Sequence, residues 1–346
     1  MKKSLFLFAV LLGLLPLQAQ IDRSQQPAPG PAPKIQLDEP QEFVLKNGLR
    51  VLVVENHKLP RASANLNIDL PPVFEGELAG VNALLSSMLG KGSKSIAKDD
   101  FDEEVDYLGA RVNIGASSAF ASSLSRYFPR VLELMADAAL NPNFLQEEFE
   151  KEKEKLIEGI KSDENSVPAA ARRVESLITY GKNHPSGEFI REETVNNVQL
   201  EDVKRFYTKN FTPQSAYLVI IGDVDFKTVK KQVTKLFKSW EGDLVKGESF
   251  PVAQNASSLE INFVEMPNAV QSEVSVDFTT EIKKTDDDYF PVILANNILG
   301  GGGQARLFLN LREDKGYTYG SYSSISTNKY RRSRMRAFAS VRNAVT

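Results

Sequence analysis

The folded part of the chain opens with the stretch Phe43-Val44-Leu45-Lys46-Asn47-Gly48-Leu49-Arg50-Val51-Leu52-Val53-Val54. Apolar residues stand on both sides of Asn47-Gly48, a dipeptide that favours the tight turn of a two-stranded hairpin. A third strand is expected over residues 64–70, because Ala64, Leu66 and Ile68 alternate there with polar residues. The sequence therefore predicts that the fold begins with an antiparallel sheet.

Helical patterns dominate the next part of the sequence. In residues 97–108, Phe101, Val105 and Leu108 recur at helical spacing, and Gly109 follows as a C-terminal cap. Further helices are expected over residues 78–89, 127–140, 145–161, 199–207 and 226–238, and a strand over residues 215–222. These elements make up a first unit of class α+β.

A second unit repeats the order of the first. We expect strands at Leu259 to Val264 and at Val274 to Phe278, a helix over 287–299, the glycine run Gly300 to Gly303, a helix over 305–313 and a strand over 317–327. Both units read strand, acidic loop, helix ending in Leu-Gly, helix, glycine and serine-rich strand. The second copy reaches Thr346 after roughly 90 residues, against roughly 200 in the first, so we expect it to be truncated.

The amino-terminal residues have the pattern of an export signal. Lys2 and Lys3 precede an apolar run, Leu5 to Leu15, that is shorter than the ~20 residues of a membrane span, and Ala19 offers a cleavage site. We therefore expect a soluble protein without a membrane span, exported most simply to a bacterial periplasm. The predicted organisation is a signal peptide (1–19), a proline-rich linker (20–40), a first domain (41–240), a second linker (241–256) and a second domain (257–346).

The amino-acid composition excludes several classes of protein. The 346 residues carry a net charge of −3, which argues against a nucleic-acid partner. The chain has no cysteine, so disulfide frameworks, iron–sulfur clusters and thiolate zinc sites are excluded. Its two histidines, His57 and His184, fall in predicted loops without carboxylates at helical spacing. We expect both to be surface histidines, and an independent metal enzyme built on them is the weakest of the alternatives.

Two further patterns differ from the chemical motifs that they partly resemble. Gly300 to Gly303 follows a helix and precedes Gln304-Ala305-Arg306, with no Gly-Lys-Ser/Thr, so a hinge between helices is favoured over a phosphate-binding loop. The chain also has no Gly-x-Ser-x-Gly sequence, which argues against a serine hydrolase.

A set of short sequences, in the same order and spacing, resembles the pitrilysin/insulinase family of zinc peptidases, in its mitochondrial-processing-peptidase-like branch. They are Leu45-Lys46-Asn47-Gly48-Leu49-Arg50-Val51, Leu108-Gly109-Ala110-Arg111-Val112-Asn113, Asn141-Pro142-Asn143-Phe144, Pro267-Asn268-Ala269-Val270-Gln271-Ser272 and the run Leu299 to Tyr319. The resemblance covers nearly everything after residue 40. It implies an α+β fold of two homologous sheet-plus-helices domains, here with the second one truncated.

Active members of this family carry an inverted zinc motif, His-x-x-Glu-His, on the first long helix. The resemblance aligns that helix with Gly80 to Leu89, and the motif positions are then Ala83, Ser86 and Ser87. The family's third ligand, a glutamate further along the chain, would fall at Gly159. Glu158 is adjacent, but one step along a helix rotates a side chain by ~100° and so turns it away from the site. The resemblance therefore implies that this chain binds no metal, supplies no catalytic residue and is inert alone, with zinc expected in a partner chain.

The resemblance also implies a substrate-binding pair in the second unit. In the family, the half without zinc supplies an arginine and a tyrosine seven residues apart, which Arg312 and Tyr319 match. Such a pair can hold a peptide carbonyl or carboxylate and stabilise oxyanion charge. The competing interpretation is that Arg312 caps a helix and Tyr319 packs on a strand; Arg306 and Tyr317 are the nearest rivals.

The favoured function is that of a secreted, non-catalytic, substrate-binding subunit of a two-chain zinc metallopeptidase. Its expected partners are a zinc-bearing subunit of the same family and an extended peptide, which would add as a strand to a sheet edge. The alternative is a structural or peptide-holding protein with no role in proteolysis, similar to the family's core subunits in respiratory complexes.

Overall fold

The computed structural model describes residues 30–31 and 39–346. The predicted signal peptide and nearly all of the linker 20–40 lie outside the described residues. Residues Pro40–Thr346 form one compact unit. Among the described residues, no helix has the length and apolar character needed to cross a membrane.

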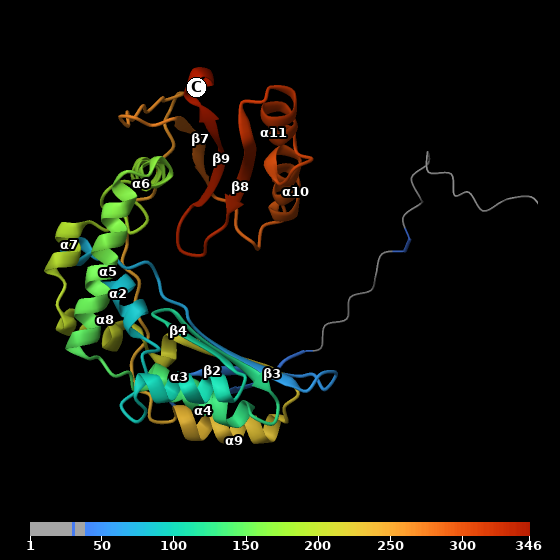
Figure 1. The fold of residues 1–346 in the computed structure, drawn as a ribbon. Coiled ribbons are helices and arrows are strands. Elements are labelled where there is room, and N and C mark those ends of the chain that lie inside the picture. The colour runs from blue at the N-terminus through green and yellow to red at the C-terminus, as the bar shows by residue number, and fades with distance from the viewer. Residues whose placement is uncertain (1–29, 32–38) are drawn as a thin grey trace, which may run out of the picture. The chain divides into compact units, whose positions relative to one another are not determined.

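A six-stranded sheet forms the first half of this unit (Figure 1). Its strands are β1 (Gln41–Val44), β2 (Arg50–Glu55), β3 (Arg61–Ile68), β4 (Arg111–Gly115), β5 (Ser118–Leu124) and β6 (Ala216–Gly222), in the order β1-β2-β6-β3-β5-β4. All neighbouring strands are antiparallel except β2 and β6, which are parallel.

The predicted hairpin is confirmed as β1 and β2, with Phe43 opposite Val51. Gly48 lies in the turn with a φ of +93°, which is a conformation that favours glycine. The Asn47 side chain donates hydrogen bonds of 2.8 Å to the carbonyl oxygens of Phe237 and Trp240. The turn is therefore tied to the carboxyl end of the last helix of this half.

Helices cover one face of the six-stranded sheet. Figure 1 shows α4 (Phe128–Leu140) and α9 (Phe226–Phe237) on the same side of the strands. Leu66 of β3, Leu218 of β6 and Leu132 of α4 are fully buried between these layers. α3 (Lys98–Tyr107) packs beside them through Phe101, as its helical spacing predicts.

A second group of helices has its own apolar core. It comprises α2 (Val81–Met88), α5 (Gln146–Glu164), α7 (Glu192–Asn197) and α8 (Leu200–Asn210), with α6 (Val167–Tyr180) following α5. Leu84, Phe149 and Val203 are fully buried at the centre of this core. The periodicity predicts α2, α5 and α8 to within a few residues, whereas α6 and α7 were not expected.

A three-stranded sheet forms the second half, from β7 (Gln271–Thr280), β8 (Thr318–Ser326) and β9 (Ser333–Arg342) in the order β7-β9-β8. Between β7 and β8 lie α10 (Tyr289–Gly300), α11 (Arg306–Phe308) and a π-helical turn, Leu309–Asp314. In the first half, β3, two helices, β4 and β5 have the same succession and the same strand order. The topology therefore agrees with the repeat that the sequence predicts.

The strand predicted at Leu259 to Val264 is wrong: these residues form no strand. Their apolar side chains alternate as in a strand, but those of Leu259, Ile261 and Phe263 are 82–89% exposed. In the first sheet, β2 is held by β6, which lies between β2 and β3. Among the described residues, no strand takes the place of β6 beside β7, so the segment has no neighbour to pair with its backbone.

Candidate functional site

Helix α2 carries the positions that the resemblance assigns to a zinc motif. Gly80 begins the helix at a φ of +114°, and its N–H donates to a Glu75 carboxylate oxygen at 2.7 Å. Burial is the main cause that raises the pKa of Glu75. Val81, Leu84, Leu85 and Met88 are buried at helical spacing. Ala83, Ser86 and Ser87 therefore occupy the less buried faces of the helix.

The side chains at these positions are poor metal ligands. Ser86 Oγ accepts a hydrogen bond from the Ala116 N–H at 3.0 Å, and Ser87 Oγ donates to the Leu84 carbonyl oxygen at 3.0 Å. Gly159 lies on α5, which packs against α2, and a Cβ added there would meet open space. A methyl group, two engaged hydroxyls and a missing side chain do not fit zinc, which prefers imidazole, thiolate and carboxylate ligands.

The buried carboxylate on this part of α5 is already paired. Glu152 is 9% exposed and accepts hydrogen bonds from Lys91 at 3.1 Å and from Lys155 at 3.0 Å. Burial by itself would raise the pKa of Glu152, but these two ammonium groups outweigh it and hold the pKa below its ordinary value. Within residues 39–346, no group of three or more histidine, aspartate or glutamate side chains is placed to hold a metal ion.

Arg312 and Tyr319 lie on neighbouring elements but do not bond to each other among the described contacts. Arg312 lies in the π-helical turn, whose i→i−5 hydrogen bond joins Lys315 N–H to the Asn310 carbonyl oxygen at 3.0 Å. Its guanidinium stacks 4.8 Å from the Phe308 ring centre and lies 3.5 Å from a Glu313 oxygen. Tyr319, on β8, is 86% exposed. π-helical turns are rare and often occur at functional sites.

The two histidines differ in their surroundings. His57 is exposed, as expected, and its Nδ1 lies 2.7 Å from an Asp223 carboxylate oxygen. That hydrogen bond is the main cause that raises the pKa of His57. His184 is 6% exposed, so the expectation of a surface histidine is wrong there. Its ring stacks on Tyr180 with 5.1 Å between centres and meets the edge of Phe250.

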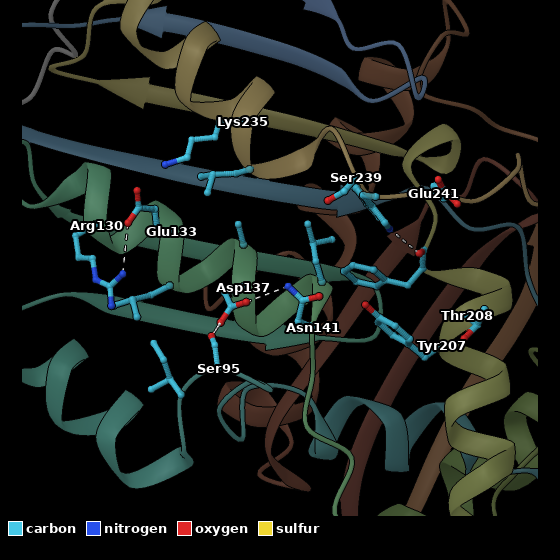
Figure 2. A pocket seen from close by; sticks show the side chains of 17 residues that line it. Ser95, Arg130, Glu133, Asp137, Asn141, Tyr207, Thr208, Lys235, Ser239 and Glu241 are labelled. Carbon is cyan, nitrogen blue, oxygen red and sulfur yellow. Dashed lines mark hydrogen bonds and ion pairs between the residues drawn. The ribbon is translucent and has the colours of Figure 1, made fainter.

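A cavity of about 490 Å³ lies between α4, α8, α9 and the segment that precedes α3 (Figure 2). Of its charged side chains, Lys235 and Glu241 make no ion pair among the described residues. The others are engaged: Arg130 pairs with Glu104 and Glu133, and Asp137 accepts hydrogen bonds from Ser93, Ser95 and Asn141. Burial would raise the pKa of Asp137, but these hydrogen bonds lower it. The engaged groups, Arg130 and Asp137, thus join α4 to α3 and to the segment that precedes α3.

A buried ion-pair cluster joins α6 to the second sheet, and the sequence analysis missed it. Glu175 of α6 accepts two hydrogen bonds of 2.9 Å from Arg336 and one of 3.0 Å from Arg334. Arg334 also bonds to Asp277. The helical pattern of α6 could have shown that Glu175 is a charged residue on a partly apolar helix face. It could not have identified the partners of Glu175, which are about 160 residues away in sequence.

Comparisons with protein families follow the two halves of the chain. The family described as "Insulinase (Peptidase family M16)" matches residues 50–186, and the one described as "Peptidase M16 inactive domain" matches residues 197–341. The "Uncharacterized zinc protease YmxG" of Bacillus subtilis (strain 168) is 26% identical over 290 residues, which cover 82% of this chain and 69% of that protein.

Solved structures show the same fold. A peptidase M16 inactive domain from Pseudomonas fluorescens aligns with a TM-score of 0.77 at 24% identity, covering 88% of this chain and 74% of that one. The periplasmic protease PqqL from Escherichia coli aligns with a TM-score of 0.67 at 16% identity, covering 89% of this chain and 36% of that one. Two family matches in succession, and a common fold, lead to one conclusion: the chain belongs to peptidase family M16, the insulinase family.

Proposed function

We propose that this chain is a non-catalytic, peptide-holding subunit of a two-chain zinc metallopeptidase. A partner chain of the same family supplies the zinc and the water-activating glutamate. The observation that carries the proposal is the donor set at Ala83, Ser86, Ser87 and Gly159, which does not fit a zinc ion. The match of residues 197–341 to a domain described as inactive supports it.

Arg312 and Tyr319 are the side chains that we assign to substrate. The Arg312 side chain is 47% exposed, and its 3.5 Å contact with Glu313 leaves most of the five guanidinium N–H donors available. The Tyr319 phenol is exposed on β8. A guanidinium and a phenol together donate hydrogen bonds to a peptide carbonyl and stabilise the negative charge that develops there during attack by water.

The proposed place of action is the periplasm. The basic residues Lys2 and Lys3, the apolar run after them and Ala19 support cleavage of a signal peptide. One structural neighbour, PqqL of Escherichia coli, is a periplasmic protease, and this chain spans about a third of its length. A two-chain enzyme would distribute over two subunits the functions that a longer chain can hold in one.

The test mixes the purified chain with its zinc-bearing partner and measures peptide cleavage. We expect cleavage by the mixture, no cleavage by this chain alone, and a large loss of kcat/KM in the mixture with Arg312→Ala or Tyr319→Phe. The matched controls are Arg306→Ala and Tyr317→Phe, which remove the same groups a few residues away and should leave the rate unchanged.

Two results would count against the proposal. An unchanged rate with both Arg312→Ala and Tyr319→Phe would remove their assigned role. A stable complex that never cleaves peptide would favour the structural alternative, a peptide-holding protein without a part in proteolysis.

A further inference from the structure

A second, larger cavity has features that the proposed function does not use. Its volume is about 1160 Å³, and it lies between the ends of β1 and β6, the segment 244–253 and the turn between β8 and β9. The carboxyl end of α6 also lines it, through Tyr180. Three of its lining side chains, Tyr180, His184 and Arg332, have hydrogen-bond donors without an acceptor among the described residues.

Tyr180 holds the first of these donors. The residue is 6% exposed, and its buried hydroxyl has no hydrogen-bond partner within residues 39–346. The ring is fixed from two sides, because His184 stacks on it and the Arg331 guanidinium carbon lies 4.8 Å from its centre. A buried hydroxyl without a hydrogen-bond partner is rare in folded proteins, so this one requires an explanation. A bound ligand that supplies an acceptor would provide it.

His184 holds the second donor. Its Nδ1 accepts a hydrogen bond of 2.9 Å from the Ser186 N–H, which assigns the proton of the neutral ring to Nε2. Burial first, and then the charge of Arg331, lower the pKa of His184, so the ring is neutral near neutral pH. Nε2–H is thus a donor, and none of the described hydrogen bonds engages it.

Two neighbouring arginines add donors and positive charge. In the described part of the chain, the buried Nε of Arg332 has no partner, and its other nitrogens make long contacts, 3.5 Å to the Ala253 carbonyl oxygen and 3.8 Å to Glu281. Arg331 stacks on Tyr180, and no carboxylate of residues 39–346 lies within 4.0 Å of its guanidinium. The cavity therefore gathers unpaired donors and positive charge, a combination that favours a negatively charged acceptor.

The charges around the cavity limit how negative its ligand can be. Four carboxylates also line it: Asp69, Glu248, Glu281 and Asp286. Asp69 is neutralised by Lys329 and bonded to Tyr330, and Asp286 accepts a hydrogen bond from the backbone of Lys283. Basic side chains line the cavity as well, Arg50 and Lys283 among them, so charges of both signs surround the ligand. Because the carboxylates repel an anion more strongly the more charge it carries, a singly charged carboxylate fits this cavity better than a phosphate does.

We propose that this cavity binds the free carboxyl terminus of a peptide. The carboxylate accepts hydrogen bonds from Tyr180 Oη, His184 Nε2 and the two arginines, and the preceding residues lie along the apolar groups of Phe250 and the neighbouring prolines. The inference rests on the proposed peptide-holding function, and it assigns the end of the peptide that the chain recognises. It also explains why the buried donors of Tyr180 and Arg332 have no acceptor among the described residues.

The test measures binding on the purified chain alone, without a partner. The probes are a fluorescein-labelled hexapeptide with a free carboxyl terminus and the same peptide with a carboxamide. We expect the free acid to bind at least about tenfold more tightly, since charge-assisted hydrogen bonds are about twice as strong as neutral ones. Tyr180→Phe, which removes one oxygen, and Arg331→Gln should each reduce this preference severalfold.

The matched control is Arg126→Gln, because the Arg126 guanidinium stacks on Tyr127 at 4.6 Å in the same way but not at this cavity. It should leave the preference unchanged. Equal binding of the acid and the amide would overturn the proposal, and so would equal losses in all three variants. Displacement of the probe by inorganic phosphate at lower concentrations than by acetate would overturn the assignment to a carboxylate. Cleavage by the two-chain mixture is a separate measurement, so either proposal can fail without the other.

Discussion

Removal of the Glu175 carboxylate should destabilise the contact between α6 and the second sheet, and with it the folded state. The side chain of Glu175 is 9% exposed and accepts three hydrogen bonds of 2.9–3.0 Å from Arg334 and Arg336. Loss of one partner from a buried ion pair costs about 3–5 kcal/mol. Two features of the structure place Glu175→Ala at the lower end of this range.

The first feature is that Arg334 keeps Asp277 as a partner, and the second is that Arg336 keeps its stacking on the Phe338 ring, 4.0 Å from the ring centre. We therefore expect Glu175→Ala to lower the free energy of unfolding by about 3 kcal/mol. Glu175→Gln should lower it less, by about 2 kcal/mol, because its amide oxygen still accepts one hydrogen bond. The assay is equilibrium unfolding in urea, followed by circular dichroism.

The pH dependence supplies an independent check. Burial would raise the pKa of Glu175, but its hydrogen bonds to Arg336, Ser275 and Arg334 lower it below the ordinary value. A carboxyl whose pKa is lower in the folded state stabilises the fold above its unfolded pKa, about 4.3 for glutamate, and loses that effect as the pH falls through the folded value. The difference between the wild type and Glu175→Gln should therefore be constant near neutral pH and shrink below about pH 4.3.

The control is Glu147→Ala, which removes an exposed ion pair with Lys151. Pairs of this kind contribute little to stability, so no measurable change is expected. The reasoning is refuted if Glu175→Ala is as stable as Glu147→Ala. It is also refuted if the deficit of Glu175→Gln persists unchanged at acid pH.

Three other predictions test local features of the fold. Gly159→Ala should raise the free energy of unfolding by about 0.5–1 kcal/mol, measured by urea titration, because the added Cβ meets open space on a helix and alanine is the better helix former. A loss of stability would show that the surface of α5 is not free there. Gly222→Ala should cost at least about 2 kcal/mol, measured in the same way, since φ is +136° and a Cβ would lie 2.2 Å from the Arg61 carbonyl oxygen; a variant of unchanged stability would contradict this backbone geometry. Amide hydrogens of residues 259–264 should exchange much faster than those of β3, as mass spectrometry can measure, because no strand of the described residues lies beside the segment. Equal protection would show that a partner strand is present.

Local patterns were sufficient to predict most of the elements. Alternation predicts β3 and β6, helical spacing predicts α4 and α9, and the Asn47-Gly48 turn predicts the first hairpin. These signals are local because each element buries one face against a single layer. The helix expected at 305–313 differs in kind: it is a short α-helix followed by a π-helical turn, a distinction that side-chain spacing over a few residues does not make.

Apart from the helices α6 and α7, the features that the sequence did not predict depend on contacts between distant segments. The segment 259–264 has the pattern of a strand, but a strand also needs a neighbour, and that depends on the rest of the sheet. His184 is in a turn, as predicted, yet it is buried because Tyr180 and Phe250 pack on it. Likewise, the unpaired donors at Tyr180 and Arg332 can be recognised only from the structure, because residues about 150 apart in sequence line one cavity.

The site assignments have a different origin from the fold. No pattern in the composition marks Ala83, Ser86, Ser87 or Gly159; the resemblance to the family gives them their meaning, and the structure places them on packed helices α2 and α5. Arg312 and Tyr319 were likewise assigned by resemblance, and they lie on adjacent elements of the second half. Their role in substrate binding stays a prediction that the cleavage assay tests.

The measurement that tests the central claim most directly is the cleavage of a fluorogenic peptide by the purified chain alone, with zinc added. Because the side chains at the family's metal positions do not fit zinc, we predict no cleavage above that of buffer. Cleavage that requires zinc, is abolished by a chelator and copurifies with this chain would contradict the claim that the chain is non-catalytic.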